Sequence, residues 1–270
     1  MGTRRNIATA IAAVAVIGVA GCGGNEGSSP TGGAGSAGSK AAPLADATSR
    51  GLPQGSEPVT LDPGDFSTTI DNPYWPMIPG SIWVYRETDT KGISQDVVVT
   101  VTRETKRIAN GITARIIRDV VRENGVPVEI TDDWYAQDAA GNVWYLGEAV
   151  ENFEKGKLVD RAGSFEAGVD GAQAGIAMPA DPTAGLSYRQ EYYAGQAEDK
   201  AAVITVGKEQ VDVPFGYFAD NVLMTRDLVP TEPRVQELKF YARGVGPLLS
   251  VHLDGSGGRS ALVKYTPGTP

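Results

Sequence analysis

The stretch VVVTVTRETKRIANGITARIIRDVVRENG, residues 97–125, decides the fold. It opens on Val97-Val98-Val99-Thr100-Val101-Thr102, and such dense β-branching favours an extended strand. Asn110-Gly111 and Asn124-Gly125 each separate apolar or β-branched runs. This dipeptide is a strong signal for a two-residue hairpin, because a type I′ turn needs positive φ at both central positions. The stretch therefore predicts an antiparallel meander.

Outward from this stretch, the chain after Gly80 keeps the same character. Alternation slips at Ile116-Ile117, which indicates a bulge or burial on both faces. No segment has sustained helical periodicity. Further strands are expected over 112–123, 126–138, 143–147, 187–193, 201–211, 217–229, 235–242, 248–253 and 262–265. We therefore predict an all-β domain over residues 59–270, with a minor helix as the only exception.

The two strand-rich blocks, about 80–147 and 185–265, resemble one another. Their matching motifs are Arg118-Asp119-Val120-Val121 with Arg226-Asp227-Leu228-Val229, Trp134-Tyr135-Ala136 with Phe240-Tyr241-Ala242, the starts at Gly80 and Gly185, and Val97 to Val101 with Ala202 to Val206. The near-constant spacing predicts two copies of one meander. Their apolar faces need a cover, so we expect packed sheets or one curved half-barrel. The alternative is coincidence between strands that reuse Val, Tyr and Gly.

Two segments break the strand pattern. Residues 148–184 are rich in glycine and proline, and they predict one short helix around Glu148 to Lys157 within a long loop or lid. In the segment 71–80, three prolines forbid a regular helix or central strand. Tyr74 and Trp75 are expected to pack onto the core there as a plug.

The N-terminus carries an export signal. Arg4 and Arg5 precede an uncharged run from Ile7 to Ala20, which has the length of a signal-peptide core and is short for a membrane span. Val19-Ala20-Gly21-Cys22 resembles the lipobox of bacterial lipoproteins. The resemblance implies cleavage before Cys22 and attachment of acyl chains, such as palmitate, at its sulfur. A plain secretory cut near the alanines is the alternative.

This organisation predicts a signal peptide over 1–21, a tether over 22–58 and a β-domain over 59–270. The tether is rich in Gly, Ser, Ala, Thr and Pro and cannot bury enough surface to offset chain ordering. The expected location is extracytoplasmic, lipid-anchored to the cell membrane or outer membrane. Cys22 is the only cysteine, so its acylation would leave no disulfide, thiolate metal site or cysteine nucleophile.

The charge argues against polyanionic partners. The formal net charge is −9, and removing Arg4 and Arg5 makes it −11. Nucleic-acid binding draws on clustered Lys and Arg, and anionic headgroups attract the same residues. Nucleic acid is therefore not an expected partner, and contact with the bilayer is expected to rest on acylated Cys22.

No cofactor, metal or catalytic residue is predicted. His252 is the only histidine, whereas zinc sites normally need several His or Cys ligands. The chain has no G-x-S-x-G, no P-loop, no G-x-G-x-x-G before a helix and no EF-hand spacing.

Carboxylates are the only plentiful reactive groups. Asp132-Asp133 is followed by Glu148 and Glu151, and Glu191, Glu198 and Asp199 lie at the matching end of the second block. Facing carboxylates about 5–10 Å apart can hydrolyse glycosides. Ordinary surface charge at strand ends is the alternative. The pairs Arg118-Asp119 and Arg226-Asp227 are expected to be ion pairs or strand-edge charges.

Aromatic residues suggest a ligand face. Adjacent rings such as Trp134-Tyr135 point to opposite faces of a strand, so one fills the core and the other needs a cover. A concave aromatic face beneath 148–183 would form an apolar cleft. Its expected ligand-binding residues are Trp83, Tyr85, Trp134, Trp144 and Tyr192. Core packing is the alternative for each ring.

Three signatures carry a resemblance over most of 59–270. They are Asp71-Asn72-Pro73-Tyr74-Trp75-Pro76, Asp133-Trp134-Tyr135-Ala136-Gln137-Asp138 with Gly141-Asn142-Val143-Trp144-Tyr145, and Arg189-Gln190-Glu191-Tyr192-Tyr193. They resemble a family of uncharacterised exported bacterial proteins, which implies no catalytic residue. The half-barrel is also similar, in fold alone, to lipoprotein carriers that shelter acyl chains, but the packing helices of those carriers are not evident here.

These observations lead to three functional hypotheses. The first is a membrane-anchored extracytoplasmic lipoprotein that binds a lipid or another apolar molecule without chemistry. The second is an envelope scaffold that works through protein contacts. The third is a carboxylate-dependent hydrolase of envelope glycans, with Asp133 and Glu148 as its test positions.

Overall fold

The computed structural model describes residues 51–89, 94–253 and 258–269. The expected signal peptide, Cys22 and most of the tether lie outside these residues. The described part is built from strands, with one short 3-10 turn. Within it, no helix has the length and apolar character needed to span a bilayer.

The elements follow one another along the chain with these bounds: η1 Pro63–Asp65, β1 Phe66–Ser67, β2 Ile82–Thr88, β3 Ser94–Arg107, β4 Thr113–Glu123, β5 Val126–Asp138, β6 Val143–Glu154, β7 Lys157–Asp160, β8 Phe165–Glu166, β9 Gly175–Met178, β10 Ser187–Tyr193, β11 Ala197–Val206, β12 Val211–Val213, β13 Gly216–Phe218, β14 Val222–Leu228, β15 Gln236–Ala242, β16 Gly246–His252 and β17 Arg259–Thr266.

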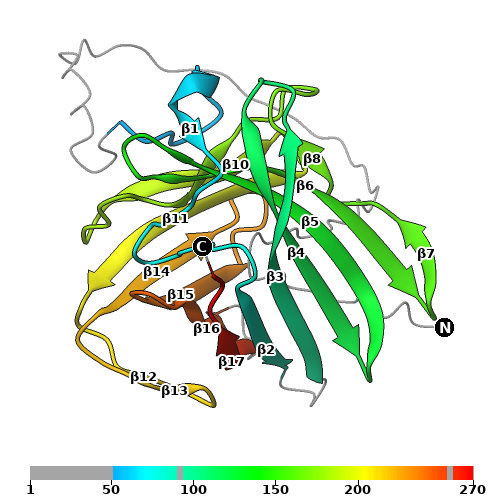
Figure 1. Ribbon diagram of the computed structural model, residues 1–270, viewed down its shortest axis with the longest axis vertical. Coiled ribbons are helices and arrows are strands. Elements are labelled where there is room, and N and C mark those ends of the chain that lie inside the picture. The colour runs from blue at the N-terminus through cyan, green and yellow to red at the C-terminus, as the bar shows by residue number, and fades with distance from the viewer. Residues whose placement is uncertain (1–50, 90–93, 254–257, 270) are drawn as a thin grey trace, which may run out of the picture.

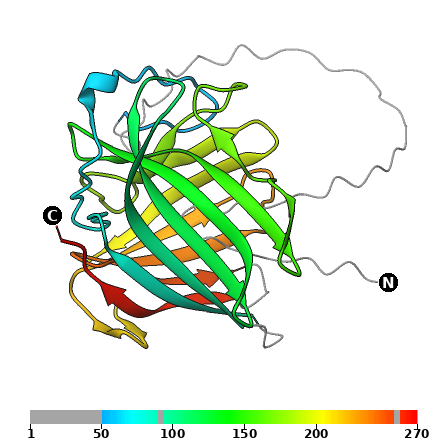
Figure 2. The same cartoon turned by 45° about the vertical axis from the view of Figure 1, so that its right-hand side comes forward.

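One antiparallel sheet of 15 strands forms the body, in the order β10-β11-β14-β15-β16-β17-β2-β3-β4-β5-β6-β7. β1, β8 and β9 pair beside this path, and β12-β13 form a separate hairpin. The sheet curves until its two ends face each other, so the strands of the second block cross behind those of the first (Figures 1 and 2). The predicted all-β meanders are confirmed, and the sheet is one curved half-barrel.

The decisive hairpins form as predicted, with one difference in turn type. Asn124 (φ 52°) and Gly125 (φ 80°) both have positive φ, as a type I′ turn requires. At the other turn, only Gly111 (φ 91°) does. Ile108 N–H donates to Ile112 O, and the Asn110 side chain accepts from Ile112 N–H. This connection is a three-residue loop with glycine in the left-handed position, because Asn110 caps the turn with its side chain.

The short helix expected around Glu148 to Lys157 is wrong. β6 continues through Glu154 and pairs with β5, with Glu148 opposite Asp133. Lys155 (φ 51°) and Gly156 (φ 74°) then turn the chain into β7. The long ladder to β5 outweighs the local helix propensity of this acidic stretch.

The remainder of 148–184 links β6 to β10, near the two ends of the strand order. β9 pairs with β6, and all four of its residues are buried. Gln173 forms a β-bridge to Tyr192 in β10. A Cβ on Gly175 would lie 2.2 Å from the carbonyl oxygen of Gln190, so the close approach of β9 to β10 requires glycine there.

The segment 71–80 is the plug that its prolines predicted. Tyr74 and Trp75 are both buried. The Trp75 ring centre lies 5.7 Å from that of Tyr135 and 6.0 Å from that of Tyr241. The plug therefore packs on both strand-rich blocks at once.

The last residues of the expected tether contact the β10 edge. Arg189 N–H donates to Pro53 O, and the Arg189 guanidinium donates to Gly55 O and to Glu57 O. Gln54 Nε2 donates to Ser187 O at 2.7 Å. Residues 53–57 thus cover one exposed edge of the sheet.

Both predicted half-units are antiparallel meanders in the structure. The first half-unit is β2-β3-β4-β5-β6, and the second is β10-β11-β14-β15-β16. Gly80 and Gly185 both have a φ of 88°, and each precedes an equivalent pair of turn bonds. Val101 N–H donates to Ser81 O, as Val203 N–H donates to Leu186 O.

That register corrects one part of the alignment. Val101 corresponds to Val203, so the match of Val97 to Val101 with Ala202 to Val206 is displaced by three residues. Runs of valine and alanine can be aligned at several offsets, and residue identity does not distinguish between them. Only the hydrogen bonds to the preceding glycine turn fix the register.

Candidate functional site

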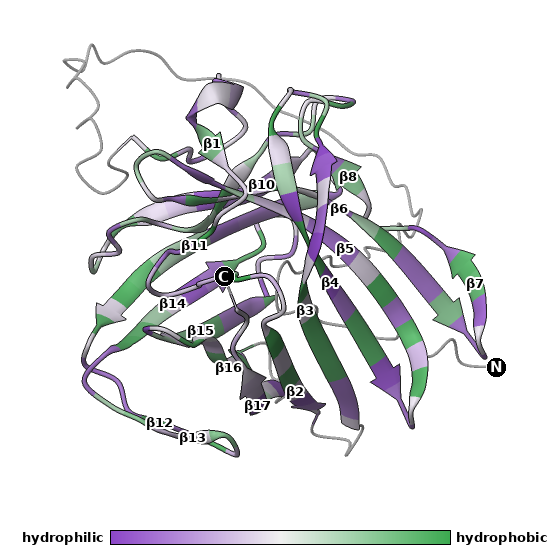
Figure 3. Cartoon of the chain, viewed as in Figure 1, coloured by the Kyte–Doolittle hydropathy of each residue, from purple (hydrophilic) through white to green (hydrophobic). Residues whose placement is uncertain are grey.

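The inner face of the curved sheet carries many buried polar residues. Along β5, Glu129, Thr131 and Asp133 are buried, whereas the residues between them are partly exposed. Figure 3 shows the resulting alternation as bands of opposite hydropathy along the long strands. Because side chains alternate between faces, this period places the acidic residues of β5 inside the half-barrel.

Eight carboxyl residues are buried, and we call them the acidic interior. They are Asp119, Glu129, Asp133, Glu148, Glu191, Asp199, Asp227 and Glu237. The buried basic residues of the described part are Lys239 and Arg189. The guanidinium of Arg189 donates to carbonyl oxygens of Gly55, Glu57 and Ala174. Lys239 is therefore the main counter-charge of the acidic interior.

The second half-unit neutralises two of its carboxylates, Asp227 and Glu237. Lys239 Nζ lies 2.8 Å from Asp227 Oδ2 and 3.5 Å from Glu237 Oε2. His252 Nε2 lies 2.9 Å from Glu237 Oε1, which also accepts from Ser250 Oγ. Burial would raise the pKa of Glu237, but Lys239 and His252 outweigh it and lower that pKa to about 2. Glu237 is thus an ionised, fully paired carboxylate.

Among the described residues of the first half-unit, no buried cation pairs with the carboxylates. Asp133 Oδ1 accepts from the Tyr145 hydroxyl at 2.8 Å, while Asp133 Oδ2, both oxygens of Asp119 and Glu148 Oε1 have no hydrogen-bond partner. Burial, reinforced by the neighbouring carboxylates, raises the pKa of Asp133 to about 7. The same causes raise the pKa values of Asp119 and Glu148 well above their usual range.

The described part of the second half-unit also contains a facing pair of carboxyl residues without a cation. Glu191 and Asp199 are opposite residues on β10 and β11, and both oxygens of Glu191 have no partner. Burial, followed by the charge of Asp199, raises the pKa of Glu191 well above its usual range, and the charge of Asp133 adds to this effect. Burial raises the pKa of Asp199 to about 8, although Lys239 opposes the shift. The interior therefore holds more acidic groups than its cations can balance.

The structure sorts the predicted carboxylates by face. Asp133, Glu148, Glu191 and Asp199 converge inside. The other predicted carboxylates point outward: Asp132 binds Arg118 at 2.7 Å, Glu151 binds Arg161 at 2.9 Å, and Glu198 accepts from Gly195 N–H at 2.8 Å.

Sequence reasoning missed half of the acidic interior. Asp119 and Asp227 were expected as ion-pair or edge residues; Asp227 does pair, with Lys239, but Asp119 does not. Glu129, Glu237 and Lys239 were not singled out. The signal that would have found them is the period of two in Glu129-x-Thr131-x-Asp133 and Glu237-x-Lys239-x-Tyr241.

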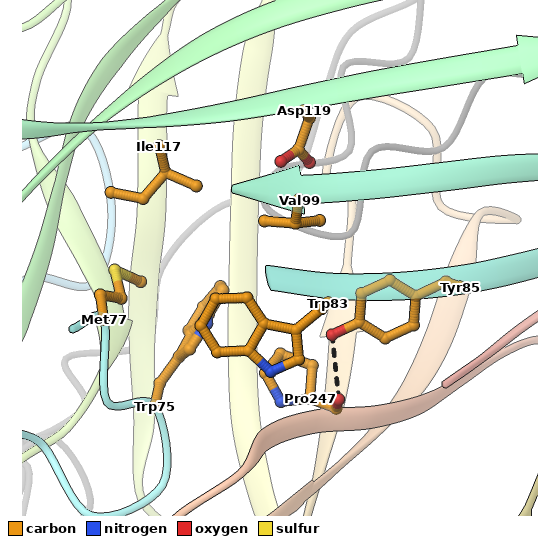
Figure 4. Close-up of a pocket in the computed structure, with 8 residues that line it drawn as sticks. All are labelled: Trp75, Met77, Trp83, Tyr85, Val99, Ile117, Asp119 and Pro247. Atoms are coloured by element: carbon orange, nitrogen blue, oxygen red, sulfur yellow. Dashed lines mark hydrogen bonds between the residues drawn. The ribbon is translucent and has the colours of Figure 1, made fainter. Parts of the chain in front are cut away.

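Only two of the five predicted ligand-binding aromatics come together. Trp83 and Tyr85 line a cavity of about 10 Å³ together with Trp75, Met77, Val99, Ile117, Asp119 and Pro247 (Figure 4). A space of this size holds about one water molecule. The rings that were expected to form a wide apolar cleft thus enclose a small pocket closed by the plug.

The other three lie elsewhere. Trp134 is covered by Lys106, whose Nζ lies 3.6 Å from the ring centre. Trp144 packs edge-on against Phe66 and donates from Nε1 to Asp138 Oδ2 at 2.8 Å. Tyr192 is half-buried on the β10 edge, where its backbone bridges to Gln173. Each of these three rings therefore has a structural neighbour of its own.

Among residues 51–89, 94–253 and 258–269, no group of three or more His, Cys, Asp or Glu side chains is arranged to hold a metal ion. His252 bonds to Glu237. The acidic interior is thus spread over many strands rather than focused on one metal-sized centre.

Comparisons with known proteins are sparse. No known protein family and no curated protein sequence matches the chain. One similar solved structure is described as a "putative lipoprotein" from Parabacteroides distasonis, with 13% identity, a TM-score of 0.39, and coverage of 73% of this chain and 100% of that one. Another is a β-barrel-like protein of the domain of unknown function DUF1849 from Brucella abortus, with 14% identity, a TM-score of 0.32, and coverage of 70% and 97%.

Proposed function

We propose that this chain is a membrane-anchored extracytoplasmic binding protein that takes a positively charged solute into its acidic interior. The observation that carries the proposal is the set of eight buried carboxyl residues. Leaving out Glu237, which pairs with Lys239, five of them have at least one oxygen without a hydrogen-bond partner. An unpaired buried carboxylate is expensive, and a bound cation removes that cost.

A cationic ligand fits the interior better than an apolar one. The aromatic part of the inner face is packed by the plug around a cavity of about 10 Å³, too small for an acyl chain. Apart from Arg189 Nε and Ser260 Oγ, the buried side-chain atoms without a hydrogen-bond partner are all carboxyl oxygens. Charge complementarity therefore selects a donor-rich, positively charged partner.

Binding is also favoured over hydrolysis. A glycosidase needs both carboxyl groups within reach of a sugar ring and a water molecule. Asp133 and Glu148 are fully buried, and Tyr145 already donates to Asp133. Small cations need far less room than a glycan does.

The location rests on the sequence. The lipobox-like Val19-Ala20-Gly21-Cys22 supports acylation at Cys22, and two acyl chains give stable anchoring. In Cys22→Ser, we expect the protein to lose palmitate labelling and to leave the membrane fraction. Retention of label in this variant would refute the anchor.

Ligand class is tested with thermal unfolding of the full chain in mild detergent. At matched ionic strength we expect spermidine or methylammonium to raise the melting temperature, since ligands stabilise the state they bind. Palmitate is the apolar ligand tested in the same assay. Stabilisation by palmitate and by neither cation would overturn the proposal and restore the apolar-ligand hypothesis.

A matched pair of variants locates the effect. Glu148→Gln removes a buried carboxylate and should reduce the cation-induced shift. Glu151→Gln lies on the same strand, faces Arg161 outside the half-barrel, and should leave the shift unchanged. Equal losses in both variants would assign the cation effect to the surface charge.

A further inference from the structure

The two half-units place corresponding residues around corresponding positions. Asp119 lies opposite Thr131 on the neighbouring strand, and Asp227 lies opposite Glu237 in the same way. Two residues further along these partner strands, Asp133 in β5 corresponds to Lys239 in β15. The glycine turns likewise align Trp83 with Tyr188.

In the second half-unit this position supplies an ammonium group. Lys239 Nζ lies 2.8 Å from Asp227 Oδ2, and both side chains are almost completely buried. Tyr241 lies two residues along β15 from Lys239, on the same buried face, and Tyr188 is buried as well.

The first half-unit keeps the acid and the rings but lacks the ammonium. Asp119 is 1% exposed, and neither of its carboxyl oxygens has a hydrogen-bond partner. The residue at the lysine position is Asp133, another acid. Asp119 is therefore the counterpart of a carboxylate that elsewhere in the same molecule binds –NH₃⁺.

A cavity lies beside Asp119. It has a volume of about 10 Å³, and Trp75, Trp83 and Tyr85 contribute to its wall (Figure 4). Trp83 Nε1 donates to Val245 O at 2.7 Å, and the Tyr85 hydroxyl donates to Pro247 O at 3.0 Å. Because these donors are already used, the rings offer the cavity their π-systems and leave Asp119 without a donor.

We propose that the first half-unit binds a primary ammonium group, as NH₄⁺ or the head of an alkylamine, in this cavity against Asp119. The inference rests on the proposed function and names its ligand class. The group occupies the place that Lys239 fills in the second half-unit. Aromatic walls attract cations, and the water-sized space admits –NH₃⁺ while excluding a quaternary ammonium.

The test is calorimetric titration of the full chain with methylammonium, tetramethylammonium and sodium chloride at matched ionic strength. We expect methylammonium to bind and the other two cations to leave no site-specific heat. In Asp119→Asn, affinity should fall at least about tenfold, as expected for losing a charge-assisted hydrogen bond. Asp132→Asn, whose side chain pairs with Arg118 outside the half-barrel, should bind like the parent.

Asp133→Lys supplies the missing ammonium internally. It should keep its near-ultraviolet circular dichroism and lose its response to methylammonium. If it does not fold, Asp119→Asn decides the matter. Unchanged affinity of Asp119→Asn for methylammonium refutes the site. A water molecule that stays in the cavity beside Asp119 when methylammonium is bound refutes it as well.

Two outcomes separate this inference from the proposed function. If spermidine or tetramethylammonium binds but methylammonium does not, a cation-binding interior stands and the ammonium cavity falls. If no cation binds at all, both fall together.

Discussion

Replacing Asp133 with asparagine should stabilise the ligand-free protein, and only above acidic pH. The side chain is completely buried, Oδ1 accepts from the Tyr145 hydroxyl, and Oδ2 has no partner. Asparagine can keep the first contact through its carbonyl oxygen while removing the titration. The groups acting on Asp133 include Glu129 and Asp132, and Asp133 in turn raises the pKa values of Asp119, Glu148 and Glu191.

The magnitude follows from linkage. Burial raises the pKa of Asp133 from 3.8 to about 7 in the folded state. Below pH 3.8 both states are protonated, and the folded protein keeps its full stability. As pH rises toward 7, the unfolded chain ionises first, so stability is lost. A difference of about three pH units corresponds to a loss of about 4 kcal/mol, complete above pH 7.

Urea unfolding from pH 4 to pH 8 measures this directly. The free energy of unfolding of Asp133→Asn should match the parent near pH 4 and exceed it by about 4 kcal/mol at pH 8. Asp132→Asn is the control, because its outward carboxylate pairs with Arg118 and such exposed pairs contribute about 1 kcal/mol or less. A pH-independent difference for Asp133→Asn, or a loss of stability at pH 8, would refute the assignment of a costly buried carboxylate.

Two further changes probe the supports of the acidic interior. Gly175→Ala brings a Cβ within 2.2 Å of Gln190 O, so the free energy of unfolding measured in urea should fall by about 1–3 kcal/mol. Gly216→Ala is the control, because its Cβ would lie 3.8 Å from the nearest atom and should change that free energy little. Lys239→Met leaves Asp227 and Glu237 without their buried cation and should cost about 3–5 kcal/mol at pH 7. The loss should be smaller near pH 3, because the stability that the parent gains from the lowered pKa of Glu237 falls away between pH 4.5 and about pH 2; equal loss at both values would argue against ion pairing.

Much of the fold could be predicted because its signals are local. The Asn124-Gly125 turn, the β-branched run in β3 and the prolines of the plug each act within a few residues. The mistaken helix at 148–157 shows the limit of such signals. Its strand conformation depends on a ladder to β5, and Glu148 lies opposite Asp133 only once that ladder forms.

The acidic interior was only partly predictable for the same reason. Sequence places Asp132 and Asp133 side by side, but the strand sends them to opposite faces with opposite environments. Which face lies inside depends on the sense in which the whole sheet curves. The convergence of Glu191 with Asp133 depends further on the half-units facing each other across the interior, which no local pattern contains.

The duplication explains how one fold carries both a scaffold and a candidate receptor. In the second half-unit, Lys239 and His252 satisfy Asp227 and Glu237, whereas both oxygens of Glu191 have no hydrogen-bond partner. In the first half-unit, Asp133 occupies the position of the lysine. The neighbouring Asp119 has no hydrogen-bond partner, and its buried charge destabilises the folded state. A free cation can remove that cost only when it is bound. Under the proposed function, the residue at position 133 therefore marks where pairing with an internal lysine in one half-unit is replaced by pairing with a bound cation in the other.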